Sequence, residues 1–192
     1  MSIREEKQQL RQEIKERQKF LSEAYYEMAD IRILDTVSAL PEFQEAETIF
    51  CYVGMNGEIN TRPLLERILR SGKRLGVPKC QGKGIMHVYE VKDLEQLQKG
   101  HYGILEPGED CPMIGPEDVD LAVIPCLSCD EQGGRLGKGG GYYDRFLEGS
   151  EFPRVALCWQ QMMNGEIPME VHDQWMDIVI TENDVIRRKL LQ

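Results

Sequence analysis

The first forty residues combine charged positions with regularly spaced apolar ones and predict two α-helices. Ser22 stands where the second helix should begin, and a serine hydroxyl at that position accepts a hydrogen bond from a free backbone N–H. Apolar residues then recur along one expected face of this helix. We expect that row to face a core; it consists of Met28, Ile31, Leu34, Val37 and Leu40.

After Pro41 the pattern changes to short runs rich in β-branched and aromatic residues, which predict strands. The expected strands are residues 48–53, 74–80, 85–91, 121–125, 155–159 and 177–181. Helical segments separate several of these strands. The clearest is 62–71, with Thr61 as its cap and Pro63 in its first turn, and 142–147 begins another.

Alternation of strand, helix and strand implies a largely parallel sheet. The runs LAVIP (121–125) and VALCW (155–159) are apolar on successive residues, which suits strands covered on both faces. We therefore expect an α/β fold, a three-layer sandwich with a mostly parallel central sheet. Residues 1–192 should form one domain, with the N-terminal helical segment 1–40 packed on it.

The stretch 100–117 interrupts this regular pattern. It is rich in Gly and Pro and has little periodicity, so it is either a wandering loop or a functional lid. We expect a loop that touches a ligand.

The overall composition is ordinary for a globular protein, with 41% hydrophobic and 29% charged residues, and no window holds the roughly 18 unbroken apolar residues of a membrane span. A net charge of −10 disfavours a nucleic-acid backbone as the main partner, because such binding rests on clustered Lys and Arg. The N-terminal residues lack the apolar core of a secretory signal and the acid-poor character of a transit peptide. We expect a cytoplasmic monomer, with a dimer as the alternative.

Six cysteines are spread along the chain, and a reducing cytosol would keep them as thiols without a structural disulfide. Cys126 and Cys129 form a CxxC pair, but no second pair or HxxxH follows to complete four zinc ligands. Small apolar residues at the end of a buried strand are therefore favoured over a metal site or a redox site.

A glycine-rich segment, 133–144, follows the apolar strand 121–125 and leads into a helical segment. In open α/β sheets ligands collect beyond the carboxyl ends of strands, and a helix N-terminus attracts anions. Arg135 and Lys138 add positive charge, and Asp144 is available to a cation. Glycines let the backbone approach phosphate oxygens closely; they are Gly133, Gly134, Gly137, Gly139, Gly140 and Gly141. The segment predicts a nucleotide phosphate site, with ATP as the expected nucleotide.

Two common nucleotide motifs do not fit this segment. No Ser or Thr follows Lys138, as a P-loop requires, and the glycines do not match the spacing GxGxxG. A flexible loop with incidental charges is the alternative. However, six glycines cost considerable folding entropy, which a bound ligand would offset.

A second basic element consists of Lys7, Arg11 and Lys15, which would lie on one face of an N-terminal helix. Like charges on one face destabilise one another, and a bound anion would relieve this repulsion. The alternative, which these residues alone favour, is a solvated face whose charges are softened by neighbouring glutamates.

Five segments together resemble the 5-formyltetrahydrofolate cyclo-ligase family, whose members are also called methenyltetrahydrofolate synthetases. They are KQQLR (7–11), GEINT (57–61), YGILEP (102–107), RLGKGGGYYD (135–144) and PMEVHDQWMD (168–177). The resemblance spans the chain. It implies an ATP- and Mg²⁺-dependent ring closure that converts 5-formyltetrahydrofolate to 5,10-methenyltetrahydrofolate and releases ADP and phosphate.

The resemblance also assigns residues to ATP. Arg135 and Lys138 are the expected catalytic residues, since they would neutralise the transferring phosphate. The full set of expected ATP contacts is Lys7, Arg11, Gly134, Arg135, Leu136, Gly137, Lys138, Gly139, Gly140, Gly141, Tyr142 and Tyr143. Other family members often carry Lys or another residue at the position of Gly140. The glycine would therefore weaken the contact with phosphate.

For the metal and the folate the resemblance implies a second set of residues. Mg²⁺ would be held by Asp144 and Asp173, with Asp177 as the alternative to Asp173. The expected folate contacts are Val53, Glu58, Tyr102, Tyr142 and Tyr143. Glu58 would accept hydrogen bonds from the pterin and lies far in sequence from both basic elements, so the two ligands should separate. Alternatively, Glu58 and Thr61 merely cap the next helix, and the tyrosines are core residues.

Two other functions are compatible with parts of this pattern. A regulatory module that binds nucleotide or folate without catalysis would share the pocket, but the intact charged residues at the predicted sites argue against it. A sugar-phosphate isomerase would need an acid/base pair near the phosphate. The three histidines, His87, His101 and His172, offer no recognisable arrangement for that role.

Overall fold

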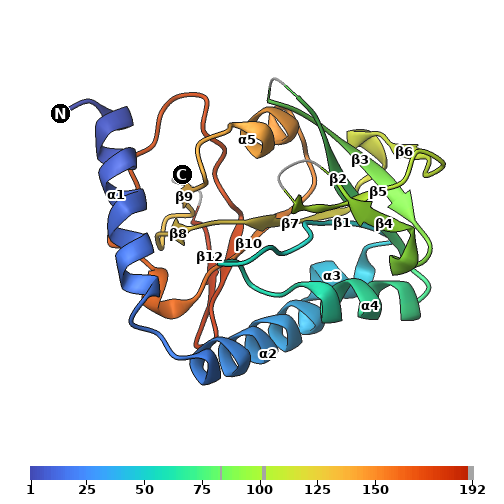
Figure 1. Ribbon diagram of the computed structural model, residues 1–192, viewed down its shortest axis with the longest axis horizontal. Helices are drawn as coiled ribbons and strands as arrows, with labels where there is room; N and C mark the ends of the chain where they lie inside the picture. Colours follow the sequence, from blue (N-terminus) through green and yellow to red (C-terminus); the bar gives the residue numbers. More distant parts are fainter. Residues whose placement is uncertain (83, 101–102, 190–192) are drawn as a thin grey trace.

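A mixed eight-stranded β-sheet runs through the centre of the protein (Figure 1). The structure is a computed structural model and describes residues 1–82, 84–100 and 103–189. The strand order across the sheet is β12-β11-β10-β7-β1-β2-β3-β6. These strands are β1 (Thr48–Cys51), β2 (Arg74–Gly82), β3 (Ile85–Val91), β6 (Met113–Ile114), β7 (Leu121–Pro125), β10 (Arg154–Leu157), β11 (Ile178–Ile180) and β12 (Val185–Arg187).

The centre of this sheet is parallel, as the sequence predicts. Strands β2, β1, β7, β10 and β11 pair in parallel, whereas β12, β3 and β6 pair antiparallel at the two edges. The strands β1 and β7 are buried at every position, which explains the uninterrupted apolar sequence of β7. Because neighbouring parallel strands end at the same edge, the loops after β1, β7 and β10 leave the sheet together.

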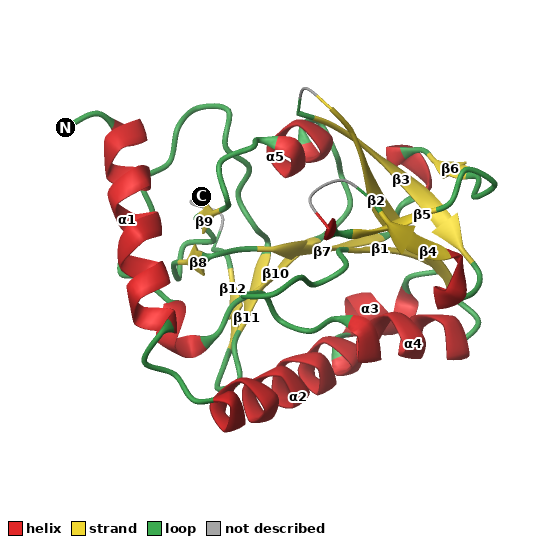
Figure 2. Cartoon of the chain, viewed as in Figure 1, coloured by secondary structure: helices red, strands yellow, loops and turns green. Residues whose placement is uncertain are grey.

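Helices lie on both sides of this sheet, which confirms the expected α/β sandwich (Figure 2). They are α1 (Ile3–Gln18), α2 (Glu23–Ala39), α3 (Pro41–Glu45), α4 (Arg62–Arg70) and α5 (Tyr142–Leu147), with 3-10 turns at Leu94–Gln96, Pro116–Asp118 and Gln160–Met162. Helices α2, α3 and α4 run along one side, and α5 lies on the other (Figure 1). Ser22 caps α2 as predicted, since its side chain accepts from Tyr25 N–H.

The predicted apolar row of α2 is wrong in its first half. Met28 is 38% exposed and Ile31 is 61% exposed. A spacing of three residues falls about 60° short of a full helical turn, so such a row drifts around the helix. The buried face instead follows a mixed spacing of four, one and three residues; it consists of Ala29, Ile33, Leu34 and Val37.

Strand β1 ends at Cys51, two residues before the predicted end. Beyond it, the Thr61 hydroxyl donates to Tyr52 O at 2.8 Å and accepts from Gly54 N–H at 2.9 Å. Thr61 is fully buried, and its side chain makes no cap hydrogen bond to α4. Thr61 therefore occupies the N-cap position of α4 as predicted, but its hydroxyl fixes the loop that follows β1 instead of capping the helix.

Two short antiparallel pairs accompany the main sheet. Strand β4 (Leu97–Lys99) pairs with β5 (Leu105–Pro107), and β8 (Ser128–Cys129) pairs with β9 (Arg135–Leu136). The stretch 100–117 therefore contains β5, β6 and a 3-10 turn rather than a structureless loop. Among the described residues, none of the helices combines the length and the apolar character needed to cross a bilayer.

Candidate active site

A cavity of about 340 Å³ lies at the carboxyl ends of the parallel strands. The loop after β1 contributes Val53, Met55 and Glu58 to its wall. The opposite wall is the glycine-rich loop that follows β7, through Arg135 and residues 137–144. The expected folate residues and the expected phosphate loop therefore face one common space.

The glycine-rich loop is held in place by a buried carboxylate that sequence analysis did not single out. Asp130 is 2% exposed, and its Oδ1 accepts from Gln132 N–H and Gly134 N–H. Its Oδ2 accepts from Ile167 N–H at 2.8 Å. A Cβ at Gly134 would come within 2.5 Å of the same carboxylate, so only glycine fits there. An Asp just after a buried strand was the available signal for this turn.

The second half of the loop turns into α5 through a glycine with positive φ. Gly141 occupies the N-cap position of α5 with φ of +68°. Any side chain there would strain the backbone and meet the Arg145 guanidinium. The cavity-lining stretch runs from Gly137 to Asp144, whereas Gly134 and Leu136 are buried in the β8–β9 hairpin outside the cavity wall. Predicted ATP contacts at those two positions remain predictions.

Arg135 is a buried cation on the floor of this cavity. Its exposed fraction is 5%; Nη1 donates to Pro125 O at 3.1 Å, and Nη2 donates to Asp144 Oδ1 at 2.9 Å. The guanidinium carbon lies 5.8 Å from the centre of the Tyr143 ring. Nε of Arg135 is buried and finds no hydrogen-bond partner among the described residues. A buried donor without a partner is costly, so this site is suited to an added acceptor such as a phosphate oxygen.

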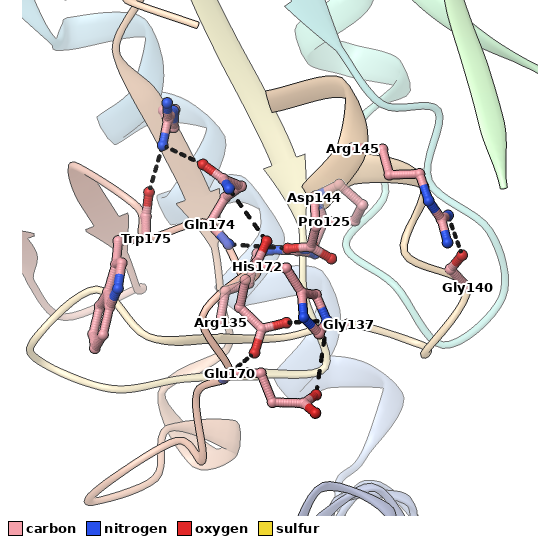
Figure 3. A network of polar contacts seen from close by, with 12 residues as sticks. Pro125, Arg135, Gly137, Gly140, Asp144, Arg145, Glu170, His172, Gln174 and Trp175 are labelled. Atoms are coloured by element: carbon pink, nitrogen blue, oxygen red, sulfur yellow. Dashed lines mark hydrogen bonds and ion pairs between the residues drawn. The ribbon is translucent and has the colours of Figure 1, made fainter. Parts of the chain in front are cut away.

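Asp144 connects Arg135 to the C-terminal loop. Figure 3 shows the carboxylate beside Gln174, whose N–H donates to Oδ1 at 3.2 Å, and the same oxygen accepts from Arg135. Burial acts to raise the pKa of Asp144, but the Arg135 charge and these hydrogen bonds outweigh burial and lower the pKa. Asp144 is therefore an ionised carboxylate at neutral pH, as a metal ligand must be.

Lys138 and Glu58 meet across the cavity. Lys138 Nζ lies 2.6 Å from Glu58 Oε1, and Glu58 Oε2 accepts from Met55 N–H at 3.0 Å. Half of the Lys138 side chain is exposed, whereas that of Glu58 is only 8% exposed. Glu58 therefore contacts one of the two basic elements although it lies far from both in sequence, because loops that follow neighbouring strands can meet. Separation of the two ligands stays a prediction.

The N-terminal basic residues divide between two environments. Arg11 reaches the glycine-rich loop, where its Nε donates to Gly137 O at 2.8 Å. Lys7 is buried and its ammonium contacts the carboxylates of Glu170 and Asp173. Lys15 is exposed. The repulsion expected along this helix face is thus relieved for Lys7 by carboxylates of the C-terminal loop, and Arg11 is adjacent to the predicted phosphate site.

Of the three candidate metal carboxylates, Asp144 lines the cavity. Asp173 precedes Gln174, the residue bonded to Asp144. Ligand atoms of Glu170, His172 and Asp173 all lie within 4.8 Å of one another, and Lys7 lowers the pKa of Glu170. Glu170 lies in the stretch 168–177 but is not among the residues predicted to hold the metal. Asp177 lies elsewhere: its Oδ2 accepts from Arg154 N–H at the amino end of β10.

The remaining predicted residues line the cavity or fall outside the described chain. Val53, Tyr142 and Tyr143 are all part of the cavity wall. Tyr143 also stacks at 6.2 Å on the buried Phe50 ring, and burial raises the pKa of its hydroxyl. Tyr143 therefore packs against the core and also lines the cavity, and its contact with a ligand stays a prediction. Tyr102 lies outside the described residues.

A second hollow of about 940 Å³ adjoins the first one. Met55, Glu58 and Ile104 line both spaces. Further along, the wall carries Tyr26 and Trp159, whose rings lie 4.5 Å apart between centroids. Together the two spaces offer an elongated site with Glu58 at its middle.

Comparison with known proteins agrees with this architecture. A family model described as the 5-formyltetrahydrofolate cyclo-ligase family matches residues 3–182. A protein from Schizosaccharomyces pombe named probable 5-formyltetrahydrofolate cyclo-ligase is 32% identical over 184 residues, which cover 87% of this chain and 90% of that protein. The mouse 5-formyltetrahydrofolate cyclo-ligase is 26% identical, over 95% of this chain and 97% of its own.

Solved structures are similar over nearly the whole chain. The NMR structure of Aquifex aeolicus 5,10-methenyltetrahydrofolate synthetase has a TM-score of 0.83 and 29% identity, and covers 97% of this chain and 96% of its own. A 5,10-methenyltetrahydrofolate synthetase from Mycoplasma pneumoniae has a TM-score of 0.74 at 20% identity, over 92% and 98% of the two chains. At that identity the second likeness is one of fold.

Proposed function

The chain belongs to the 5-formyltetrahydrofolate cyclo-ligase family, and we propose that it converts 5-formyltetrahydrofolate to 5,10-methenyltetrahydrofolate with conversion of ATP to ADP and phosphate. The observation that carries this proposal is the shared cavity. Arg135 and Lys138 on one wall suit a phosphoryl group, and Glu58 on the other suits the N–H groups of a pterin. Phosphoryl donor and folate would therefore meet in one enclosed space.

The proposed reaction explains the need for both ligands. The formyl oxygen is a poor leaving group, so transfer of the γ-phosphoryl group to it prepares its departure. Attack of N10 on the activated formyl carbon forms the new C–N bond, and the oxygen then leaves as inorganic phosphate. The protein mainly positions the two ligands and stabilises the charge on the transferring group.

Arg135 fits the charge-stabilising role because of its surroundings. Its guanidinium is held rigidly by Pro125 O and Asp144, and Nε is a buried donor without a partner among the described residues. A donor that is already in place requires no reorganisation when negative charge develops nearby. Lys138 is half exposed, so it can follow the phosphate as a mobile cation.

The carboxylates of Asp144 and Asp173 suit Mg²⁺ by their chemistry. Hydrogen bonds from Arg135 and Gln174 both go to Oδ1 of Asp144, and Asp173 follows in the C-terminal loop. Mg²⁺ prefers one or two carboxylates together with phosphate oxygens and water. Asp144 and Asp173 would hold the ion, which when bound neutralises charge on the phosphates. Asp177 is less suitable because its carboxylate accepts a hydrogen bond from Arg154 N–H at the amino end of β10.

An isotope experiment tests the chemical course directly. The enzyme is given 5-formyltetrahydrofolate with a heavy oxygen isotope in the formyl group, together with unlabelled ATP and Mg²⁺. We expect the label in the released inorganic phosphate and not in ADP. Label in bulk water, or product without ATP consumption, would contradict phosphorylation of the formyl oxygen. We further propose that the enzyme works in the cytoplasm; an Arabidopsis thaliana relative, by contrast, is named mitochondrial.

A further inference from the structure

Three cysteine side chains converge beside the candidate active site. The sulfur atoms of Cys126, Cys129 and Cys158 all lie within 4.8 Å of one another. Cys126 follows β7, Cys129 belongs to β8, and Cys158 follows β10. Strands β7 and β10 are parallel neighbours, which brings the loops at their carboxyl ends together. Cys158 thus adds a third thiol to the CxxC pair of Cys126 and Cys129.

The cluster reaches the candidate active-site cavity at Cys126. Cys129 and Cys158 are buried, whereas Cys126 is half-buried and lines the cavity that also holds Arg135. A small ion can therefore reach the thiols from the cavity, and its open coordination position would face that space. A structural cysteine packed as a small apolar residue needs no such access.

Backbone carbonyls hold two of the three thiols. Cys126 donates to Leu157 O at 3.0 Å, and Cys158 donates to Trp159 O at 3.5 Å. Because metal ligation by thiols requires deprotonation, a bound cation would replace these two hydrogen bonds.

We propose that Cys126, Cys129 and Cys158 form a binding site for a soft, thiophilic metal ion, Zn²⁺ or Cu⁺. Three thiolates are a complete set for Cu⁺ and leave one open position for Zn²⁺, to be filled by water from the cavity. Each thiol that becomes a ligand releases its proton to solvent, and no oxidation or reduction occurs. Because Cys126 lines the active-site cavity, occupancy inhibits turnover, a consequence that rests on the proposed function.

Metal binding is measured with the full chain, freshly reduced and freed of metal. Titration with Cd²⁺, a spectroscopic substitute for Zn²⁺, should give thiolate-to-metal charge-transfer absorbance that saturates at one ion per chain. Cys129→Ser and Cys158→Ser should each weaken binding at least about tenfold. The matched control is Cys80→Ser, because Cys80 lines the same cavity outside the cluster. It should keep the wild-type affinity.

A second test uses the wild-type protein, so its outcome does not depend on whether a variant folds. Mass spectrometry after alkylation should show that one equivalent of bound metal protects Cys126 while Cys80 still reacts. Competition against a zinc chelator and against a Cu⁺ chelator, in separate titrations, identifies the preferred ion. Saturable inhibition of turnover, reversed by the chelator, tests the consequence for the active site.

Several results would overturn the proposal. They are an absence of stoichiometric charge-transfer absorbance, equal loss of binding in Cys80→Ser, and unprotected Cys126 in the presence of metal. A further contrary result is that the reduced protein binds no metal, whereas peroxide rapidly forms a disulfide within the cluster. The cluster would then serve redox chemistry instead. The binding spectra are independent of the folate reaction, so failure of the proposed activity would be recognised separately.

Discussion

Lys138 of the glycine-rich loop and Glu58 of the loop after β1 form an ion pair, with 2.6 Å between Nζ and Oε1. The pair joins the wall that suits phosphate to the wall that suits a pterin. A phosphate bound by Lys138 and a pterin bound by Glu58 must therefore approach each other closely. Transfer of a phosphoryl group between two ligands requires this proximity.

Replacing Lys138 tests the mobile cation. Lys138→Ala should lower turnover by at least about tenfold, because a charge directed at a transferring phosphoryl group contributes a few kcal/mol to transition-state stabilisation. Its side chain is half exposed, so thermal unfolding should change little. Steady-state kinetics and a melting curve check both parts. A variant with wild-type turnover would remove Lys138 from the mechanism.

Replacing Glu58 tests the folate wall. Glu58→Gln keeps an acceptor for Met55 N–H but loses the charge, and should raise the KM for 5-formyltetrahydrofolate roughly 10- to 100-fold through loss of a charge-assisted hydrogen bond. The KM for ATP should not rise, because Lys138 is freed rather than lost. A rise in the KM for ATP alone, or a loss of stability with intact folate kinetics, would make Glu58 a phosphate-side or purely structural residue.

Asp173 and Asp177 form a matched pair of variants for the metal site. Asp173→Asn should raise the Mg²⁺ concentration for half-maximal activity at least about tenfold. Asp177→Asn should lower stability through the hydrogen bond to Arg154 N–H but leave the Mg²⁺ dependence unchanged. Magnesium titrations of both variants at fixed ATP provide the comparison. A larger Mg²⁺ effect in Asp177→Asn would reverse the assignment.

The pairing of Arg135 with Asp144 predicts a specific acid sensitivity. The pKa of Asp144 is lower in the folded protein than its ordinary value of 3.8. Its ionised form therefore adds stability that is fully present above about pH 4 and is lost as pH falls through the lower, folded-state pKa. We expect the difference in free energy of unfolding between wild type and Asp144→Asn to shrink below pH 4. Denaturant titrations across this range would show a constant difference if the pairing were unimportant.

Much of this site follows from the sequence because local patterns specify it. The apolar runs 121–125 and 155–159 identify the buried parallel strands β7 and β10, and the glycines after β7 mark a loop near the carboxyl edge. Local patterns do not specify which side chains meet across that edge. The contact between Lys138 and Glu58, the turn held by Asp130 and the third thiol of Cys158 depend on strand order, which one sequence does not reveal.

The turn after β1 shows the same limit on a smaller scale. Thr61 precedes Pro63 and has the sequence signature of a helix cap. The hydroxyl instead binds Tyr52 and Gly54, because the polar groups of the buried loop also need partners. The Thr61 hydroxyl can either cap the helix or bond the buried loop. It bonds the loop, because buried backbone groups there would otherwise lack partners.

The central claim is tested most directly by the near-ultraviolet absorbance of 5,10-methenyltetrahydrofolate. Purified protein is mixed with 5-formyltetrahydrofolate, Mg²⁺ and ATP, and parallel reactions omit ATP or contain Arg135→Ala. The absorbance should grow only in the complete reaction with wild-type protein, with one ADP released for each product, and at least about tenfold more slowly with Arg135→Ala. Absence of growth in the complete reaction, or equal growth without ATP, would contradict the proposed function.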